Sequence, residues 1–318
     1  MPDAIEAAPK LVSLIVPFYN EESGLDAFWQ RLLPLIGNSP ERFEIICIDD
    51  GSTDRTLPLL IAAASRDSRI RVIEFSRNFG KEAALTAGID LARGDAVIPL
   101  DADLQDPPEL IGAMIAQWRA GAEVVLAHRA DRSSDGALKR RSAALFYQLH
   151  NFLAPVPIPA NSGDFRLMDR VVVEALKRLP ERQRFMKGLF AWVGFRTVTL
   201  DYARPPRAAG ESRFSGWRLW NLALEGITSF STVPLRIWTY AGLASAFLTF
   251  LYGCAIILRT LISGIDVPGY ASLFVAVLML GSLQLVSIGI LGEYLGRVYL
   301  ETKQRPAYIV RREYGAGQ

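Results

Sequence analysis

The chain has 318 residues, half of them hydrophobic, and a formal net charge of +2. This length and composition predict one sizeable domain with a hydrophobic core plus a smaller second part, and they exclude an intrinsically disordered chain. The nearly balanced charge excludes the strong basic field that would favour nucleic acid as the main partner. Cys47 and Cys254 each lie in an apolar run, so we expect two buried thiols and no disulfide.

Short β-branched runs alternate with longer amphipathic segments in the N-terminal half of the chain. The expected strands cover residues 11–16, 43–48, 70–75, 96–100 and 123–127. This alternation predicts an α/β fold with a mostly parallel sheet and helices on both faces, in which ligands bind beyond the carboxyl ends of the strands. The first ten residues lack the apolar stretch of a secretory signal, so we expect residues 1–210 to form a cytosolic domain.

Polar residues follow three of these strands. The first two clusters contain Pro17, Tyr19, Asn20, Glu21, Asp50, Gly51 and Ser52. Because the carboxyl ends of parallel strands lie at one edge of a sheet, we expect the clusters to meet there. An Asp-Gly-Ser sequence on its own is usually a turn, and we expect Asp54 to cap the helix that follows it.

The third cluster follows the fourth strand and contains Asp101, Ala102, Asp103 and Gln105. Continued alternation along an extended strand would point Asp101 and Asp103 the same way, and their carboxylates would then repel each other unless a cation lies between them. Mg²⁺ and Mn²⁺ prefer such oxygen ligands and also bind diphosphate oxygens. The cluster therefore predicts a divalent metal site, to which Gln105 would add a carbonyl oxygen or a water contact. Asp106, followed by two prolines and a glutamate, is expected to be a helix N-cap.

Two further stretches contain residue types that bind phosphate. Residues 76–81 lead from a strand into a helix and include Gly80 and Lys81, so they would offer a cation beside a helix N-terminus; a loop of solvated charges is the alternative. A basic cluster comprises Arg129, Arg132, Lys139, Arg140 and Arg141. Near a membrane, such a cluster indicates phosphate or headgroup binding, although we expect some of its members to be surface charges.

The C-terminal third contains two long apolar segments. Residues 237–258 and 269–292 have no charged side chain across 22 and 24 positions, whereas crossing a bilayer takes about 20 residues. We therefore expect two transmembrane helices within residues 234–300, at about 237–260 and 269–292. The alternative is a pair of buried core helices.

The flanks of these segments predict their orientation. Basic residues lie before the first segment and after the second, so the positive-inside rule places both chain ends, including a tail at residues 301–318, in the cytosol. Glu293 and Arg297 are expected to form an ion pair at the membrane boundary. Residues 211–233 form an amphipathic pattern, which predicts a helix that lies in the headgroup layer or packs on the N-terminal domain.

Several separate strings, in the same order, resemble the polyprenyl-phosphate glycosyltransferases of the inverting GT-A type. They are residues 16–22, 49–52, 76–82, 101–109, 161–166, 184–188 and 292–297. The resemblance extends over nearly the whole chain. The pattern is most similar to that of the bacterial bactoprenol glucosyltransferases. Dolichol-phosphate mannose synthases and the aminoarabinose-transferring enzymes are more distant, and the latter differ at residues 76–81.

The resemblance implies a GT-A (Rossmann-like) fold and a role for each candidate residue. The implied metal ligands are Asp101, Asp103 and Gln105. The implied nucleotide site is made by Pro17, Tyr19, Asn20, Glu21, Asp50, Gly51, Ser52, Lys81, Asp101, Ala102, Arg129 and Arg140. Within it, Asp50 would face the uracil, and Arg129 and Arg140 would bind phosphates. Asp164 would be the catalytic base, with Asp103 and Arg166 as further catalytic residues.

The implied reaction is metal-dependent, inverting transfer of glucose from UDP-glucose to undecaprenyl phosphate, at the cytosolic face of a bacterial inner membrane. The lipid bilayer would be a partner, and association of copies through the two spans would give a homo-oligomer. A phosphate monoester has a second pKa of about 6 and is already largely dianionic at neutral pH. Asp164 is therefore either a base or a residue that positions Arg166 or the acceptor.

Three other functions are alternatives to this reaction. The transferred sugar would be mannose or aminoarabinose if the chain followed the more distant relatives. A processive polysaccharide synthase would carry a Gln-x-x-Arg-Trp sequence, which Arg182 to Phe185 does not supply. A catalytically silent membrane scaffold would keep the fold without turnover, and the intact Asp101 and Asp103 pair argues against that function.

Overall fold

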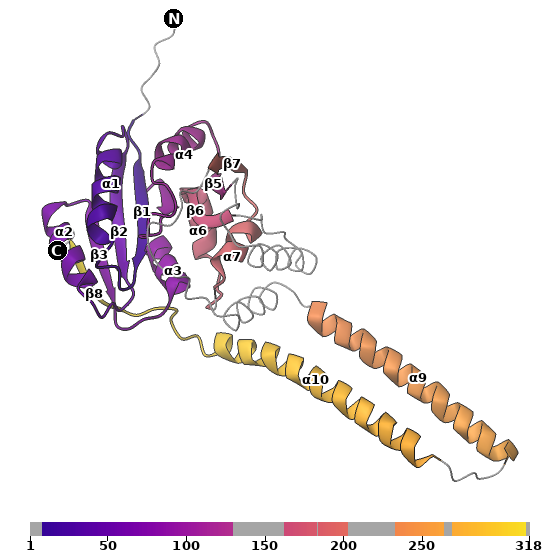
Figure 1. Cartoon of the computed structure of the whole chain (residues 1–318). Helices are drawn as coiled ribbons and strands as arrows, with labels where there is room; N and C mark the ends of the chain where they lie inside the picture. The colour runs from indigo at the N-terminus through magenta and orange to yellow at the C-terminus, as the bar shows by residue number, and fades with distance from the viewer. Residues whose placement is uncertain (1–7, 130–161, 183, 203–232, 264–268, 316–318) are drawn as a thin grey trace, which may run out of the picture.

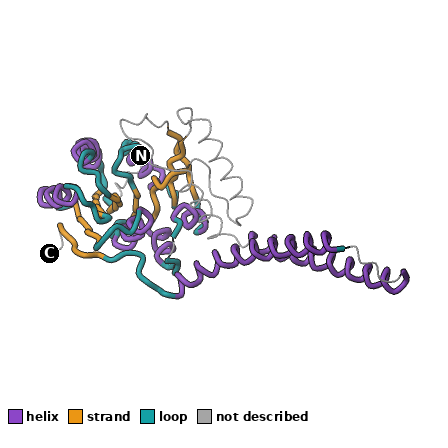
Figure 2. Tube along the Cα trace, turned by 60° about the horizontal axis from the view of Figure 1, so that its bottom comes forward, coloured by secondary structure: helices purple, strands orange, loops and turns teal. Residues whose placement is uncertain are grey.

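The computed structural model describes residues 8–129, 162–182, 184–202, 233–263 and 269–315. These residues form two parts, a globular α/β domain and a long helical hairpin that extends away from it (Figure 1). The same two parts remain distinct when the molecule is turned (Figure 2). The predicted helix at residues 211–233 and most of the basic cluster, including Arg140, lie outside the described residues.

One eight-stranded sheet forms the centre of the domain. Its strands, in chain order, are β1 (Leu11–Phe18), β2 (Arg42–Asp49), β3 (Ile70–Phe75), β4 (Ala96–Pro99), β5 (Val124–Arg129), β6 (Ser162–Asp169), β7 (Thr197–Tyr202) and β8 (Val310–Gly315). Their spatial order is β7-β5-β6-β4-β1-β2-β3-β8. The four central strands β4-β1-β2-β3 are parallel, as are β5 and β7, whereas β6 and β8 pair antiparallel with their neighbours.

The five predicted strands and the mostly parallel centre of the sheet are confirmed. Three strands were not predicted. β6 has several polar residues, and β7 alternates between exposed and half-buried positions without a buried run. β8 has the sequence Val-Arg-Arg-Glu-Tyr-Gly and lies within residues 301–318, which were expected to be a separate tail.

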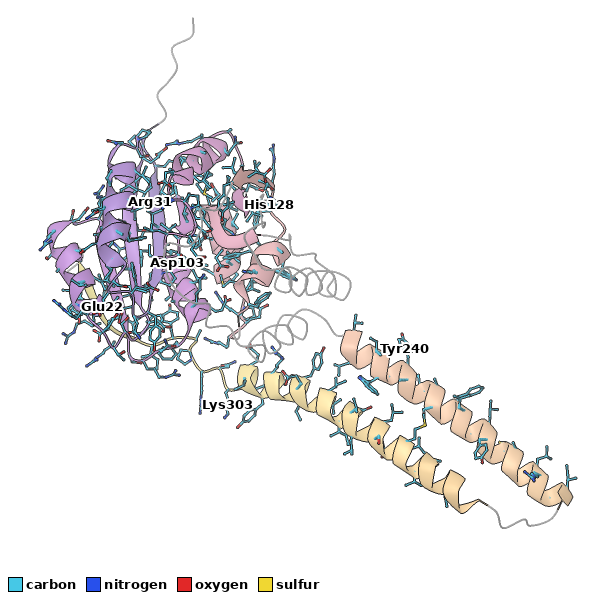
Figure 3. All side chains as sticks on the ribbon, in the orientation of Figure 1. Glu22, Arg31, Asp103, His128, Tyr240 and Lys303 are labelled. Atoms are coloured by element: carbon cyan, nitrogen blue, oxygen red, sulfur yellow. The ribbon has the colours of Figure 1, made fainter. Side chains whose placement is uncertain are left out.

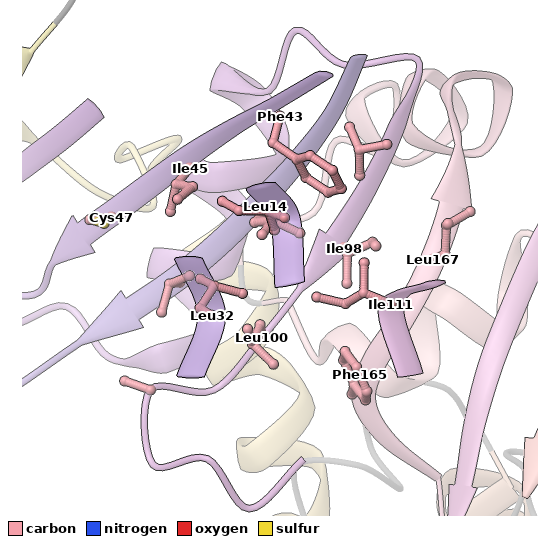
Figure 4. Packing of buried hydrophobic residues seen from close by; sticks show 14 of the residues in the cluster. Leu14, Leu32, Phe43, Ile45, Cys47, Ile98, Leu100, Ile111, Phe165 and Leu167 are labelled. Carbon is pink, nitrogen blue, oxygen red and sulfur yellow. The ribbon is translucent and has the colours of Figure 1, made fainter. Parts of the chain in front are cut away.

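Helices cover both faces of the sheet, as predicted. They are α1 (Leu25–Gly37), α2 (Thr56–Arg66), α3 (Lys81–Leu91), α4 (Leu110–Arg119), α6 (Arg170–Lys177) and α7 (Met186–Trp192). The core beneath α1, α2 and α4 includes Phe28, Leu60 and Met114 (part of it is shown in Figure 4). A second core on the opposite face includes residues of α3, α6 and α7, such as Leu85 and Leu189. Cys47 is buried in the first core, as expected.

Strand β8 closes one edge of the sheet. Its Glu313 accepts hydrogen bonds from Arg71 of β3, with the shorter at 2.8 Å, and Tyr314 donates to Glu74 at 2.8 Å. Arg71 also contacts the buried Glu44 at 3.2 Å. Pairing satisfies the backbone groups of β3 that an open edge would expose. The C-terminal segment is therefore an integral part of the sheet.

The hairpin consists of α9 (Val233–Ser263) and α10 (Tyr270–Thr302). Each contains a segment long and apolar enough to cross a membrane, Ile237–Ala255 and Met279–Thr302, and none of the side chains described in these segments is buried. The alternative of two buried core helices is therefore wrong. Cys254 is exposed on α9, which corrects the expectation of a second buried thiol.

The hairpin joins the domain at the ends of its two helices. Tyr240 near the start of α9 and Lys303 just after α10 lie at the domain end of the hairpin (Figure 3). The predicted pair of Arg297 and Glu293 is confirmed at 3.2 Å. Beyond Lys303 the chain returns to the domain, where the Tyr308 hydroxyl donates to Asp90 of α3 at 3.0 Å.

Candidate functional site

The loops after β1 and β2 are joined by hydrogen bonds. The Asn20 amide donates to Ser52 Oγ at 3.1 Å, and Asn20 Oδ1 accepts from the Thr53 amide at 2.8 Å. The Glu21 amide donates to Thr56 Oγ1 at 2.9 Å. Asn20 has a φ of 56°, and asparagine tolerates this left-handed conformation better than most residues do. The two clusters thus meet at one sheet edge, as predicted.

Gly51 and Asp50 connect this edge to the loop at residues 76–81. Gly51 has a φ of 69°, and a Cβ on it would lie 2.6 Å from the carbonyl carbon of Arg77, so only glycine fits. The carboxylate of Asp50 accepts hydrogen bonds from the amides of Phe79 at 2.6 Å and Gly80 at 2.9 Å. Asp50 is buried and supports this loop, and the uracil contact that the family resemblance implied stays a prediction.

Lys81 lies between two carboxylates from different strands. Its Nζ is 2.7 Å from Asp101 Oδ1 and 2.8 Å from Asp164 Oδ2. Burial lowers the pKa of Lys81, but Asp101 and Asp164 outweigh this effect and raise that pKa above its ordinary value. Lys81, which was predicted as a phosphate-binding cation, therefore pairs with Asp101 and with the residue that the resemblance implied to be the base.

The Asp101 to Gln105 segment is a turn, not an extension of the strand. β4 ends at Pro99, and Leu104 has a φ of 55°. Strand alternation therefore does not align Asp101 with Asp103, which corrects the geometric argument made from the sequence. Asp103 is exposed, and its Oδ1 accepts from the Gln105 amide at 3.1 Å.

Negative charge gathers in front of this turn. Burial raises the pKa of Glu21, and the nearby charges of Asp103, Asp54 and Asp101 raise it further. Among the residues that the structure describes, no three acidic, histidine or cysteine side chains form a complete metal site. The oxygen donors of Asp101 and Asp103 nevertheless fit Mg²⁺ or Mn²⁺, because these ions complete their coordination with water and with substrate phosphate oxygens.

Asp164 and Arg166 project from β6. Burial raises the pKa of Asp164, but Lys81, Lys187 and Arg166 together lower it below the ordinary value, so the carboxylate is ionised at neutral pH. Arg166 is buried over the ring of Phe190, with 4.1 Å between guanidinium carbon and ring centroid, and burial lowers its pKa to about 10. Asp164 Oδ1 and Arg166 Nε are buried without hydrogen-bond partners, which is costly unless a ligand engages them.

Two charged residues beside Asp164, Glu82 and Lys187, had no predicted role. Burial and the charge of Asp164 raise the pKa of Glu82 to about 7, and its Oε2 accepts from the Met186 amide at 3.0 Å. Lys187, the next residue in α7, also acts on this carboxylate. Both residues belong to strings that carry the family resemblance, at 76–82 and 184–188, and that was the only sequence signal for them.

The remaining predicted residues lie as follows. Pro17 is the last but one residue of β1, Tyr19 is exposed beyond it, and Ala102 is buried in the turn. Arg129 ends β5. Asp54, predicted to cap α2, lies one residue before the cap position, which Arg55 occupies, and accepts from the Thr56 amide at 2.9 Å.

The N-cap prediction for Asp106 is wrong. α4 begins at Leu110, with Glu109 at the cap position. Asp106 is buried and accepts a hydrogen bond from the Tyr202 hydroxyl at 2.7 Å. It therefore connects the turn to β7.

Comparison with known families assigns the two parts of the chain separately. Residues 13–177 match the model of glycosyl transferase family 2, and residues 233–298 match the GtrB C-terminal hairpin. These two ranges correspond to the α/β domain and to the helical hairpin.

Similar proteins cover nearly the whole chain. A bactoprenol glucosyl transferase of Shigella phage SfV is 54% identical over 302 residues, which are 95% of this chain and 98% of that protein. A prophage bactoprenol glucosyl transferase homolog of Escherichia coli K12 is 53% identical over 301 residues, covering 95% and 98%. An uncharacterized glycosyltransferase of Synechocystis is 51% identical over 304 residues, covering 96% of each chain.

A solved structure supports the fold. Glucosyl-3-phosphoglycerate synthase from Mycobacterium tuberculosis, in complex with Mn²⁺, UDP and phosphoglyceric acid, superposes with a TM-score of 0.51 at 20% identity. The match covers 69% of this chain and 76% of that one. With the family match to the α/β domain, it confirms the predicted GT-A fold class.

Proposed function

The chain belongs to glycosyl transferase family 2, and from this premise we propose that it transfers glucose from UDP-glucose to a polyprenyl phosphate with inversion at the anomeric carbon. The observation that carries the proposal is the meeting of Asp101, Lys81 and Asp164 at the carboxyl edge of a family 2 domain that is joined to an apolar hairpin. Relatives that are 53% and 54% identical over almost their full length are named bactoprenol glucosyl transferases, which supports both the sugar and the lipid acceptor.

The donor would bind where the strand-end loops meet. The loops at residues 17–21 and 49–52 are held together by Asn20 and Ser52 and would enclose the uridine, with Asp50 keeping the 76–81 loop in place. Asp101 and Asp103, with Gln105, would hold Mg²⁺ or Mn²⁺. When bound, this ion neutralises charge on the departing diphosphate.

The acceptor oxygen would attack the anomeric carbon from the side of Asp164. A phosphate monoester is largely dianionic at neutral pH and needs no base. Because Asp164 is ion-paired with Lys81 and its pKa is low, its role would be to position Lys81 and Arg166 rather than to remove a proton. Inversion follows because a single displacement moves the new bond to the opposite face of the sugar.

The hairpin would hold this site at the membrane. If α9 and α10 both cross the membrane, the two chain ends lie on the same side of it. The basic residues that flank the two segments favour the cytosolic side. The chain would then lie in a bacterial inner membrane as a two-span protein, with the domain at residues 1–210 near the headgroups, and copies would associate through their hairpins. Arg129 and Arg140 would bind phosphates at this surface.

Lipid-dependent release of UDP distinguishes this enzyme from a catalytically silent scaffold. The purified chain in detergent is expected to release UDP from UDP-glucose only when undecaprenyl phosphate is present. Because a metal ion contributes several kcal/mol to such a transition state, EDTA should lower the rate by at least about 100-fold, and added Mn²⁺ should restore it. If UDP is not released from any sugar nucleotide, the scaffold function is correct; if EDTA has no effect, the metal assignment fails.

A further inference from the structure

Lys187 is the one charged residue in the sequence of α7. The preceding amide, that of Met186, donates to Glu82 Oε2 at 3.0 Å, and this bond fixes the start of α7 against α3. Phe190, one turn further along α7, packs under the guanidinium of Arg166. α7 is thus attached to both residues that flank Asp164, and the Lys187 ammonium acts electrostatically on Asp164 and Glu82.

Lys187 differs from the other two cations of the site because it has no hydrogen-bond or ion-pair partner among the described residues. Lys81 contacts two carboxylates, and Arg166 donates to the carbonyl of Gly163 at 2.8 Å. Within the described part of the chain, Lys187 has no hydrogen bond or ion pair, although its side chain is half-buried. Three cations therefore surround Asp164, and one of them is available to a ligand. An ammonium that pairs with no described carboxylate favours an anionic ligand, such as a phosphate oxygen.

The position of α7 relative to the hairpin indicates from where that anion would arrive. The carboxylate oxygens of Glu301, in the last turn of α10, accept from the Arg182 amide at 3.0 Å. The end of a membrane helix is thus bound to the chain five residues before Lys187. In Figure 1, α3 and α7 lie on the side of the domain from which the hairpin extends. A lipid phosphate in the headgroup layer would reach Lys187 from this side.

We propose that Lys187 binds the phosphate monoester of the lipid acceptor and holds it beside Asp164. This inference rests on the proposed function and adds an acceptor-binding residue to it. Arg166 Nε and Asp164 Oδ1, which are buried without partners, lie on the same strand and form the wall against which the acceptor would be held. Because Lys187 contacts the acceptor and not the donor, its removal should affect the two substrates unequally.

Steady-state kinetics with both substrates varied tests this inference. Lys187→Met keeps the length of the side chain and removes its charge. Since a charge-assisted hydrogen bond contributes about 1.5–3 kcal/mol, the KM for undecaprenyl phosphate should rise by at least about 10-fold, with the KM for UDP-glucose unchanged. Lys187→Arg should stay within about 3-fold of wild type, because it retains the charge. Lys177→Met on α6 is the matched control.

The outcomes separate the two claims. If the wild-type chain transfers no glucose to undecaprenyl phosphate, the proposed function fails. If it does, and Lys187→Met keeps the wild-type KM for the lipid or raises both KM values equally, the role of Lys187 is wrong. Quenching of tryptophan fluorescence by UDP with Mn²⁺, measured without lipid, checks that each variant is folded. Lys187→Gln replaces the methionine variant if that one does not fold, with the same expected result.

Discussion

Replacing Asp101 with asparagine is expected to lower kcat/KM for glucosyl transfer by about 1,000-fold, since it removes about 4 kcal/mol of transition-state stabilisation. Asp101 has two roles in the account: it would be a metal ligand, and it holds Lys81 Nζ at 2.7 Å. Asparagine keeps the size of the side chain but loses the charge that both contacts need. The loss should be measured as initial rates at saturating Mn²⁺ with both substrates varied.

The Asp101→Asn variant should remain folded. Lys81 and Asp101 are 44% and 32% exposed, and ion pairs this accessible to solvent contribute no more than about 1 kcal/mol. Asp201→Asn is a matched control, because Asp201 of β7 is 71% exposed and pairs with His128 of β5. The control should keep its rate. Activity of Asp101→Asn within tenfold of wild type, at an unchanged thermal midpoint, would contradict the metal-site assignment.

Replacing Asp164 with asparagine is expected to lower kcat by about 100-fold, by the same amount at pH 6 and at pH 8.5. Burial raises the pKa of Asp164, but the surrounding cations lower it below its ordinary value, so this group stays ionised across that range and cannot produce an inflection in it. Loss of the carboxylate releases Lys81 and leaves Arg166 without its neighbouring charge. Misplacement of such groups costs about 100-fold in rate at any pH.

The pH profile distinguishes positioning from base catalysis. The second pKa of the acceptor phosphate, about 6, should set the inflection in wild type and in Asp164→Asn alike. A defect that is confined to low pH and recovers once the phosphate is dianionic would identify Asp164 as a general base. Near-normal turnover of the variant at every pH would contradict both roles.

The sequence predicted the centre of the fold because strong local signals coincide there. β2, for example, contains the continuous apolar run Ile45 to Ile48, and a parallel sheet buries such a run on both faces. β8 lacks that signal, since it is paired on one side only and its charges bind Arg71 and Glu74 from a distant part of the chain. Its partner strand is about 240 residues away, a separation that residue periodicity does not report.

The sequence predicted several residues of the candidate site but not the contacts between them. Asp101, Asp164 and Lys81 were all identified, yet the Lys81 bridge between two strand ends depends on how β4 and β6 pair, and β6 was not predicted. The left-handed Leu104 changed the geometry of the Asp101 to Gln105 segment in a way that strand alternation does not reveal. Asp50 similarly binds backbone amides about 30 residues away.

Product analysis with a panel of sugar nucleotides tests the central claim most directly. The purified chain in detergent, with undecaprenyl phosphate and Mn²⁺, is given UDP-glucose, GDP-mannose and UDP-aminoarabinose in parallel, and the lipid product is identified by mass and by the NMR coupling of its anomeric proton. We expect a glucosyl phosphate lipid from UDP-glucose with the β configuration, inverted from the α-linked donor. Preference for another donor, or an α-linked product, would contradict it.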